Sequence, residues 1–156
     1  FCRAGASMND EIYTMIPNRD AVVGYLSRMG NIVFAYLFGS YKTGLQNAMS
    51  DIDLAVYVTD GLSLLEQGAI VSELEKMTGC DVDLVLLNNA MAHHPRLAYD
   101  VVFCGELLVS KNDALLHDYR RRTLHYFFDT EPLRRMVSAG LERRLALGAF
   151  AKFDDA

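Results

Sequence analysis

The chain has 156 residues and a net charge of −5 at pH 7, with 51% hydrophobic residues. A chain of this length buries about two-thirds of its unfolded surface, which is enough for one ordinary core without a disulfide or metal staple. No apolar run approaches the ~18 residues of a membrane helix, no signal-peptide pattern opens the chain, and the negative charge disfavours a general nucleic-acid binder. We therefore expect a soluble globular domain that contacts neither a membrane nor nucleic acid directly.

Charge and cysteine usage add two expectations. Residues 1–110 carry 13 acidic and 6 basic side chains, whereas residues 111–156 carry 9 basic and 7 acidic ones. The basic tail forms either a solvated helix face or a contact with an acidic partner. Cys2, Cys80 and Cys104 are an odd number without CxxC or Cys/His spacing, which argues against a disulfide framework and a structural zinc site and favours the reducing cytoplasm.

Hydrophobic periodicity predicts the elements of the first part of the chain. Asn18 is expected to cap a first helix that ends at Gly30. Residues 32–38 (IVFAYLF) have the pattern of a strand buried on both faces, and residues 52–58 (IDLAVYV) form a second β-rich run. Residues 40–50 are a polar connection between the two predicted strands.

The same reasoning continues through the middle of the chain. Residues 63–77 have the amphipathic pattern of a helix, and residues 82–87 (VDLVLL) are a third strand. Residues 91–103 are predicted as one helix and residues 106–109 as a short edge strand.

Two helices are expected at the end, at residues 113–128 and 133–149, with Thr130 as a cap and Pro132 in the first turn of the second. Their apolar residues are predicted to form the seam of a helical hairpin, mostly core, with an exposed part as a partner surface in the alternative interpretation. These residues are Leu124, Tyr126, Phe127, Phe128, Leu133, Met136, Val137 and Leu141.

We expect a single α/β domain over residues 8–156, with its core at 18–110 and its C-terminal helices at 111–149. Residues 1–7 show no periodicity and are expected to be a disordered terminus or an expression remnant.

Three aspartates carry the chemistry that the sequence suggests. Asp51 and Asp53 lie two residues apart at the start of a strand, so both carboxylates share one face. Hard oxygen ligands at this spacing suit Mg²⁺ or Mn²⁺. If the strand that carries Asp83 is a neighbour, it supplies a third carboxylate, and three carboxylates can hold two ions about 4 Å apart for a nucleotidyl transfer.

A glycine–serine turn precedes the aspartates. Gly39-Ser40 follows a buried strand, where a turn without a Cβ exposes N–H groups and the serine hydroxyl can bond a phosphate oxygen. Lys42 is placed to neutralise phosphate charge. Each feature alone is common in turns and strand ends, but their order and spacing together indicate a triphosphate site beside a metal site.

Residues near position 95 provide weaker candidates. Arg96 follows Pro95 on the substrate side of the expected sheet and is a candidate contact for phosphate or base. His93 and His94 would point about 100° apart on a helix, so we expect them to be surface residues and not a metal-binding pair.

The pattern Gly39-Ser40-x10-Asp51-x-Asp53 resembles the signature of the DNA polymerase β-like nucleotidyltransferase superfamily. The segments LFGSYKTG, SDIDLAVYV and DVDLVLLN are similar to those of minimal nucleotidyltransferases, the antitoxin halves of HEPN-MNT toxin–antitoxin pairs. The resemblance runs from about residue 21 to residue 109. It implies an α/β (α+β) fold with a small mixed β-sheet flanked by helices, followed by two C-terminal helices.

The resemblance also implies a function and residue roles. The expected activity is that of a type VII antitoxin, which uses ATP and two Mg²⁺ ions, or Mn²⁺, to transfer AMP to a tyrosine of its HEPN ribonuclease toxin. Gly39 and Ser40 would hold the β and γ phosphates. Asp51 and Asp53 would ligate both metals, and Asp83 would complete one metal site and act as the base for the tyrosine hydroxyl.

Three alternatives stay open. An aminoglycoside-type nucleotidyltransferase uses the same site, but it usually has a longer helical domain than the roughly 45 residues that follow Val109. A non-catalytic antitoxin would neutralise its toxin by contact alone, although the intact carboxylates speak against this. Asp81 competes for the role of Asp83, one step farther out on the same face, and we prefer Asp83.

Overall fold

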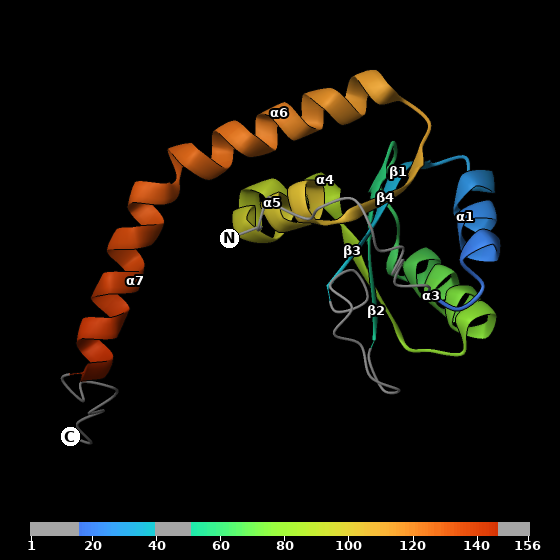
Figure 1. Cartoon of the computed structure of the whole chain (residues 1–156), viewed down its shortest axis with the longest axis horizontal. Coiled ribbons are helices and arrows are strands. Elements are labelled where there is room, and N and C mark those ends of the chain that lie inside the picture. The colour runs from blue at the N-terminus through green and yellow to red at the C-terminus, as the bar shows by residue number, and fades with distance from the viewer. Residues whose placement is uncertain (1–15, 40–50, 147–156) are drawn as a thin grey trace, which may run out of the picture.

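A computed structural model describes residues 16–39 and 51–146 of the chain, without the side chains of residues 133–134 and 141–146 (Figure 1). The helices are α1 (Arg19–Arg28), α3 (Leu64–Thr78), α4 (Leu87–His93), α5 (Pro95–Cys104), α6 (Asp113–Asp129) and α7 (Glu131–Ala146). The strands are β1 (Ile32–Phe38), β2 (Ile52–Val58), β3 (Val82–Leu86) and β4 (Glu106–Ser110). The strands therefore form where the apolar runs predicted them.

The strands form one mixed four-stranded sheet in the order β3-β2-β1-β4. The central strand β1 is antiparallel to both β2 and β4, whereas β2 and β3 are parallel. Residues 32–37 of β1 are all buried, as the uninterrupted apolar run predicted, because helices cover both faces of this strand. The expected α+β fold with a small mixed sheet is confirmed.

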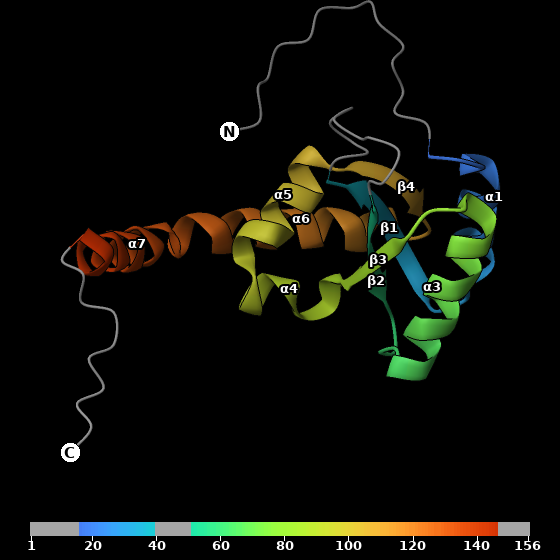
Figure 2. The same cartoon turned by 90° about the horizontal axis from the view of Figure 1, so that it is seen from below.

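Helices cover the two faces of the sheet unequally. Helices α1 and α3 lie on one face, and α4, α5 and α6 lie on the other (Figures 1 and 2). Each side has its own apolar cluster. The α1/α3 side includes Val22, Leu26, Leu37, Leu54, Ile70 and Leu74. The α4/α5/α6 side includes Phe34, Tyr36, Ala55, Ala98, Val101 and Tyr119.

Helix α3 shows how local sequence sets the boundaries of an element. Ser63 and Glu66 form a reciprocal capping box, in which the Glu66 carboxylate accepts from the Ser63 N–H at 2.8 Å and the Ser63 hydroxyl accepts from the Glu66 N–H at 3.3 Å. Gly79 ends the helix in the left-handed region with φ 70°. The 15 residues of α3 form the crossover that the parallel pairing of β2 and β3 requires.

Two helix predictions in the core need correction. Asn18 occupies the N-cap position of α1, as predicted, but its side chain accepts no hydrogen bond from the helix. Asn18 has φ 54°, and its side-chain amide donates instead to the Met77 carbonyl at 2.5 Å. The helix predicted over residues 91–103 is two helices. Helix α4 begins directly after β3, and Pro95, which cannot continue a helix from the preceding turn, starts α5 at its first position.

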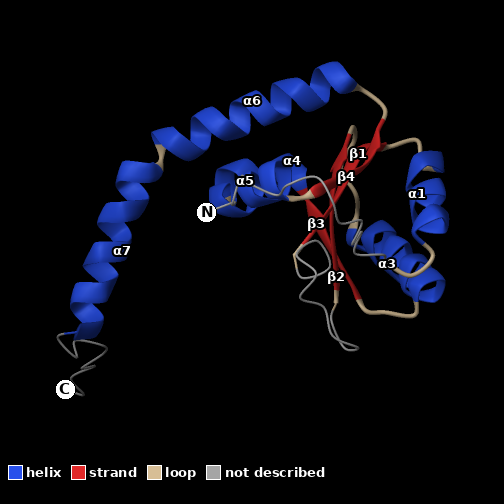
Figure 3. Cartoon of the chain, in the orientation of Figure 1, coloured by secondary structure: helices blue, strands red, loops and turns tan. Residues whose placement is uncertain are grey.

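The predicted helical hairpin is also wrong. Helix α6 is held on the body by the Tyr119 hydroxyl, which donates to the Leu87 carbonyl at 2.7 Å, but α7 turns away from the sheet and contacts mainly α6 (Figure 3). Met136 and Val137 are 72% and 63% exposed and are not core residues. Thr130 closes α6, with its hydroxyl donating to the Tyr126 carbonyl at 2.7 Å. The last predicted helical positions, 147–149, lie outside the described residues.

Cys104 is disulfide-bonded, which the number and spacing of the cysteines did not predict. None of the helices within residues 16–39 and 51–146 is both long enough and apolar enough to cross a membrane.

Candidate functional site

The sheet brings two of the predicted site aspartates side by side. Asp53 in β2 is the register partner of Asp83 in β3, and the Ile52 N–H donates to the Asp81 carbonyl at 2.8 Å just before this pair. Because the two strands are parallel and in register, the Asp53 and Asp83 side chains point to the same face. The expectation that the third strand neighbours the second is confirmed.

The neighbouring strand β1 identifies that face. Phe38 is the register partner of Asp53, and Tyr36 is the partner of Ala55. Tyr36 and Ala55 belong to the cluster under α4, α5 and α6, and Phe38 packs against that cluster. The aspartates therefore lie on the α4/α5/α6 face, at the edge where β2 and β3 begin. Alternation places Asp51 on the same side, one step before Asp53.

The carboxylates interact electrostatically. Burial raises the pKa of Asp53 above its usual range, and the negative charges of Asp83 and Asp51 raise it further. Carboxylates whose negative charges repel one another are suitable ligands for a hard divalent cation, because the cation offsets this repulsion. Within the described parts of the chain, however, no three His, Cys, Asp or Glu side chains are already gathered as a metal cluster.

Gly39 lies next to the Asp53 carboxylate. It has φ 73°, a backbone conformation that glycine adopts without strain. A Cβ at this position would lie 1.9 Å from the Asp53 Oδ2, and 2.8 Å from its Cγ. The sequence pattern suggested Gly39 as a phosphate-binding turn but did not reveal that it also makes room for the Asp53 carboxylate.

The predicted site residues therefore divide into two groups. Gly39, Asp53 and Asp83 come together at one end of the sheet, with Asp51 beside them. The predicted phosphate contacts Ser40 and Lys42 lie outside the described residues.

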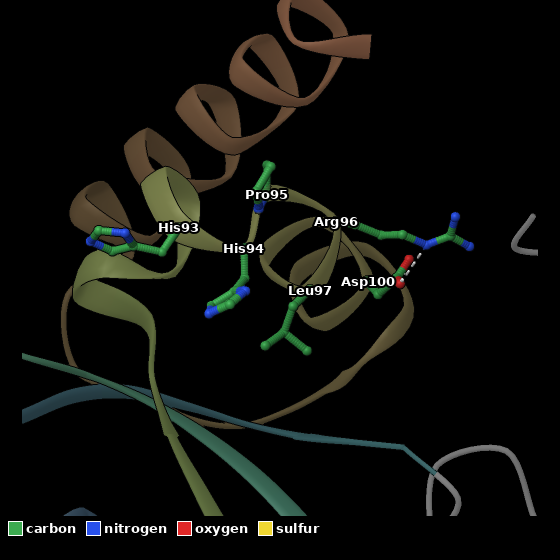
Figure 4. A pocket seen from close by; sticks show the side chains of 6 residues that line it. All are labelled: His93, His94, Pro95, Arg96, Leu97 and Asp100. Carbon is green, nitrogen blue, oxygen red and sulfur yellow. Dashed lines mark ion pairs between the residues drawn. The ribbon is translucent and has the colours of Figure 1, made fainter. Parts of the chain in front are cut away.

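A hollow of about 450 Å³ lies where α4 meets α5. It is lined by His93, His94, Pro95, Arg96, Leu97 and Asp100. In Figure 4 the side chains of His94 and Leu97 point toward the strands, while Arg96 and Asp100 lie together along α5. The Arg96 Nε is 3.6 Å from the Asp100 Oδ2, and the two side chains are 78% and 50% exposed.

The sequence pointed to Arg96 as a candidate contact beside His93, His94 and Pro95, but it did not identify Leu97 and Asp100 as parts of the same hollow. The spacing of Arg96 and Asp100, four residues apart on a helix, was the available signal, since such residues lie on one helix face. His93 and His94 are both exposed, as expected.

A profile of the family described as polymerase beta, nucleotidyltransferase, matches residues 21–114, which is more than half of the chain. The chain is 44% identical over 55 residues to the protein adenylyltransferase MntA of Shewanella oneidensis. That match covers 35% of this chain and 40% of MntA, so it spans less than half of that relative.

Solved structures with the same fold include complexes. A chain in the crystal structure of a mutant of the toxin–antitoxin MntA-HpeT is 25% identical, with a TM-score of 0.68 over 80% of this chain and 98% of that one. A chain of a tri-AMPylated Shewanella oneidensis HEPN toxin in complex with MNT antitoxin is 24% identical, with a TM-score of 0.64 over 80% and 96%. The second likeness concerns the fold alone.

Proposed function

Because the chain belongs to the polymerase beta nucleotidyltransferase family, we propose that it is a protein adenylyltransferase acting as the antitoxin of a type VII system. Its substrates are ATP and a tyrosine of a cognate HEPN ribonuclease toxin. The observation that carries this proposal is the register pair of Asp53 and Asp83 on one face, with Gly39 against Asp53. This arrangement supplies carboxylates and a close backbone turn at one place, as metal-assisted nucleotide transfer requires.

Family membership implies a nucleotide substrate and a divalent metal. The proposed ligands of two Mg²⁺ ions are Asp51, Asp53 and Asp83, a set of hard oxygen donors that fits this metal, with Mn²⁺ as a substitute. When bound, the ions supply positive charge that neutralises the triphosphate and stabilises the leaving oxygen. Gly39, Ser40 and Lys42 are the proposed contacts for the phosphates.

The proposed reaction is an in-line displacement at the α-phosphorus of ATP. The tyrosine oxygen forms a bond to this phosphorus, and the bond from the phosphorus to the oxygen bridging to the β-phosphate breaks. Pyrophosphate leaves with that bonding electron pair, and the phenolic proton passes to the carboxylate of Asp83. Asp83 suits this role better than Asp53, because it is exposed on the edge strand β3, where a protein acceptor can approach, whereas Asp53 is half-buried.

The partner is proposed from two findings. The curated relative is named a protein adenylyltransferase, and the fold matches chains from toxin–antitoxin complexes, one of them with an AMPylated HEPN toxin. We place this activity in one domain over residues 8–156 and in the cytoplasm, where ATP is available.

The test uses purified HEPN partner, the full chain, ATP and Mg²⁺, followed by intact mass of the partner. The expected result is an increase of one or more AMP units that requires Mg²⁺ and that is lost with Asp53→Asn. Asp60→Asn is the matched control, because Asp60 is an exposed carboxylate beyond the other end of β2. A partner that is inhibited by binding but gains no mass would identify a non-catalytic antitoxin. Adenylylation of an aminoglycoside but not of the partner would identify a small-molecule enzyme.

A further inference from the structure

The hollow between α4 and α5 lies on the same side of the sheet as the candidate metal site. Two residues inward from the aspartates, Ala55 and Val85 form the next register pair on that face. Val85, like Leu97 of the hollow, is half-buried and packs against the apolar cluster of this side. Half-buried apolar side chains of β3 and of α5 therefore pack on the same cluster, on the face that carries the carboxylates.

The position of α5 favours the nucleotide over the protein acceptor as the ligand of this hollow. Helix α5 packs against β1, the strand that ends at Gly39, whereas α4 packs against β2. The proposed phosphate contacts follow β1, and the proposed base Asp83 lies on β3 at the far edge of the sheet. A group bound beside α5 is thus on the phosphate side of the metal site.

The chemistry of the lining suits a purine. Leu97 and Pro95 offer apolar contact, and the His94 imidazole is a flat surface for a ring. The ion pair of Arg96 and Asp100 is long and exposed, so little free energy holds its partners together. The guanidinium is consequently able to stack on a ring, and the carboxylate is able to accept a hydrogen bond from an exocyclic amine.

We infer that this hollow seats the adenine base of ATP, with Asp100 accepting from the 6-amino group and Leu97 and Arg96 contacting the ring. This inference rests on the proposed function, because it assigns the base of a nucleotide whose phosphates are held at the aspartates. It also makes Asp100 the residue that distinguishes ATP from ITP, which has a carbonyl oxygen in place of the 6-amino group. A carboxylate facing that oxygen repels it and makes no hydrogen bond.

The experiment is calorimetric titration of the full chain with Mg²⁺ and three probes: a non-hydrolysable ATP analogue, the corresponding ITP analogue, and inorganic tripolyphosphate. The unmodified chain is expected to bind the ATP analogue about tenfold more tightly than the ITP analogue, since a hydrogen bond to a charged group contributes roughly 1.5 kcal/mol or more. Asp100→Ala should abolish this preference. It should leave tripolyphosphate binding unchanged, because the phosphates do not reach the hollow.

Asp118→Ala is the matched control, because Asp118 likewise pairs with an arginine at a spacing of four residues, Arg122 on α6, but does not line the hollow. Leu97→Ser provides a second test that involves no charge, and it should weaken both nucleotide analogues several-fold but not tripolyphosphate. The inference would be overturned if the unmodified chain and both hollow variants bound the ATP analogue equally tightly. Asp100→Ala would then discriminate between the ATP and ITP analogues no differently from the unmodified chain.

The same titrations separate this inference from the proposed function. If Asp53→Asn abolishes the binding of tripolyphosphate and of the ATP analogue while the hollow variants leave it unchanged, the proposed function is retained and only the base site is excluded. Absence of Mg²⁺-dependent binding of every probe to the unmodified chain would overturn both.

Discussion

Gly39 and Asp53 are so close that a methyl group on the first would overlap the carboxylate of the second, at 1.9 Å from Oδ2. The contact joins the end of β1 to the beginning of β2, two segments that the antiparallel register holds side by side. The Asp53 carboxylate is also the one whose pKa is raised by burial and by Asp83 and Asp51. Gly39 therefore determines where the most confined carboxylate of the site can lie.

Gly39→Ala should reduce the rate of AMP transfer by about 100-fold or more, because displacing a catalytic group by about 1 Å costs roughly this factor. The strain of a positive φ adds a loss of stability of about 1 kcal/mol. Initial rates and urea denaturation measure the two effects separately. Gly61→Ala is the control, since a Cβ at Gly61 would meet nothing within 4 Å. An active Gly39→Ala variant would show that Asp53 does not need its observed position.

Replacing Asp83, which lies in β3, should affect AMP transfer more than replacing Asp81, which precedes β3. Asp83→Asn should lower the rate of AMP transfer by about 100-fold or more, the usual contribution of a general base. Asp81→Asn should change it less than about tenfold, because the register pairs Asp83 with Asp53, and Asp81 precedes the strand. The measurement is the single-turnover rate at saturating ATP. A larger loss in Asp81→Asn than in Asp83→Asn would reverse the assignment.

Ser63→Ala should destabilise the chain by about 1 kcal/mol, because it removes the hydroxyl that accepts from the first turn of α3. Ser63→Thr should retain most of the stability, since threonine also caps helices. Denaturant titration gives the free energies of unfolding. AMP transfer by the folded variant should be unchanged, because α3 begins beyond the end of β2 opposite to the aspartates. A loss of activity without a loss of stability would contradict this separation.

Tyr119→Phe should cost about 1–2 kcal/mol near neutral pH, because the buried Leu87 carbonyl loses its donor. Burial raises the pKa of Tyr119 to about 12, above its ordinary value of 10. The stability that protonated Tyr119 contributes is therefore complete below pH 10 and is lost as the pH rises toward 12. The difference in unfolding free energy between the two proteins should narrow over this range. Tyr126→Phe, at an exposed tyrosine, is the control, and a pH-independent difference would contradict the raised pKa.

The strands could be predicted from the sequence because burial on both faces leaves an uninterrupted apolar run, as in residues 32–38. The aspartates could be located because their spacing of two puts them on one face of a strand. The register of Asp53 with Asp83 could not be derived in the same way, because it depends on strands that are distant in sequence. The steric role of Gly39 depends on the same pairing.

The wrong predictions also concern contacts that a local sequence pattern does not specify. Asn18 has the residue type of a cap, but a carbonyl from the distant α3 takes its side chain. The apolar residues of the last two helices indicate a buried seam, yet a pattern does not specify whether the partner is in the same chain. In the structure α7 leaves the body, and Met136 and Val137 are exposed.

ATP labelled at one phosphorus at a time distinguishes a site that moves a nucleotidyl group from one that moves a terminal phosphate. With the HEPN partner and Mg²⁺, label from the α-phosphate should appear on a tyrosine of the partner, label from the γ-phosphate should leave as pyrophosphate, and Asp53→Asn should abolish both. Transfer of the γ-label to the partner, or no transfer of either label by a folded chain that binds ATP and the partner, would contradict nucleotidyl transfer at this site.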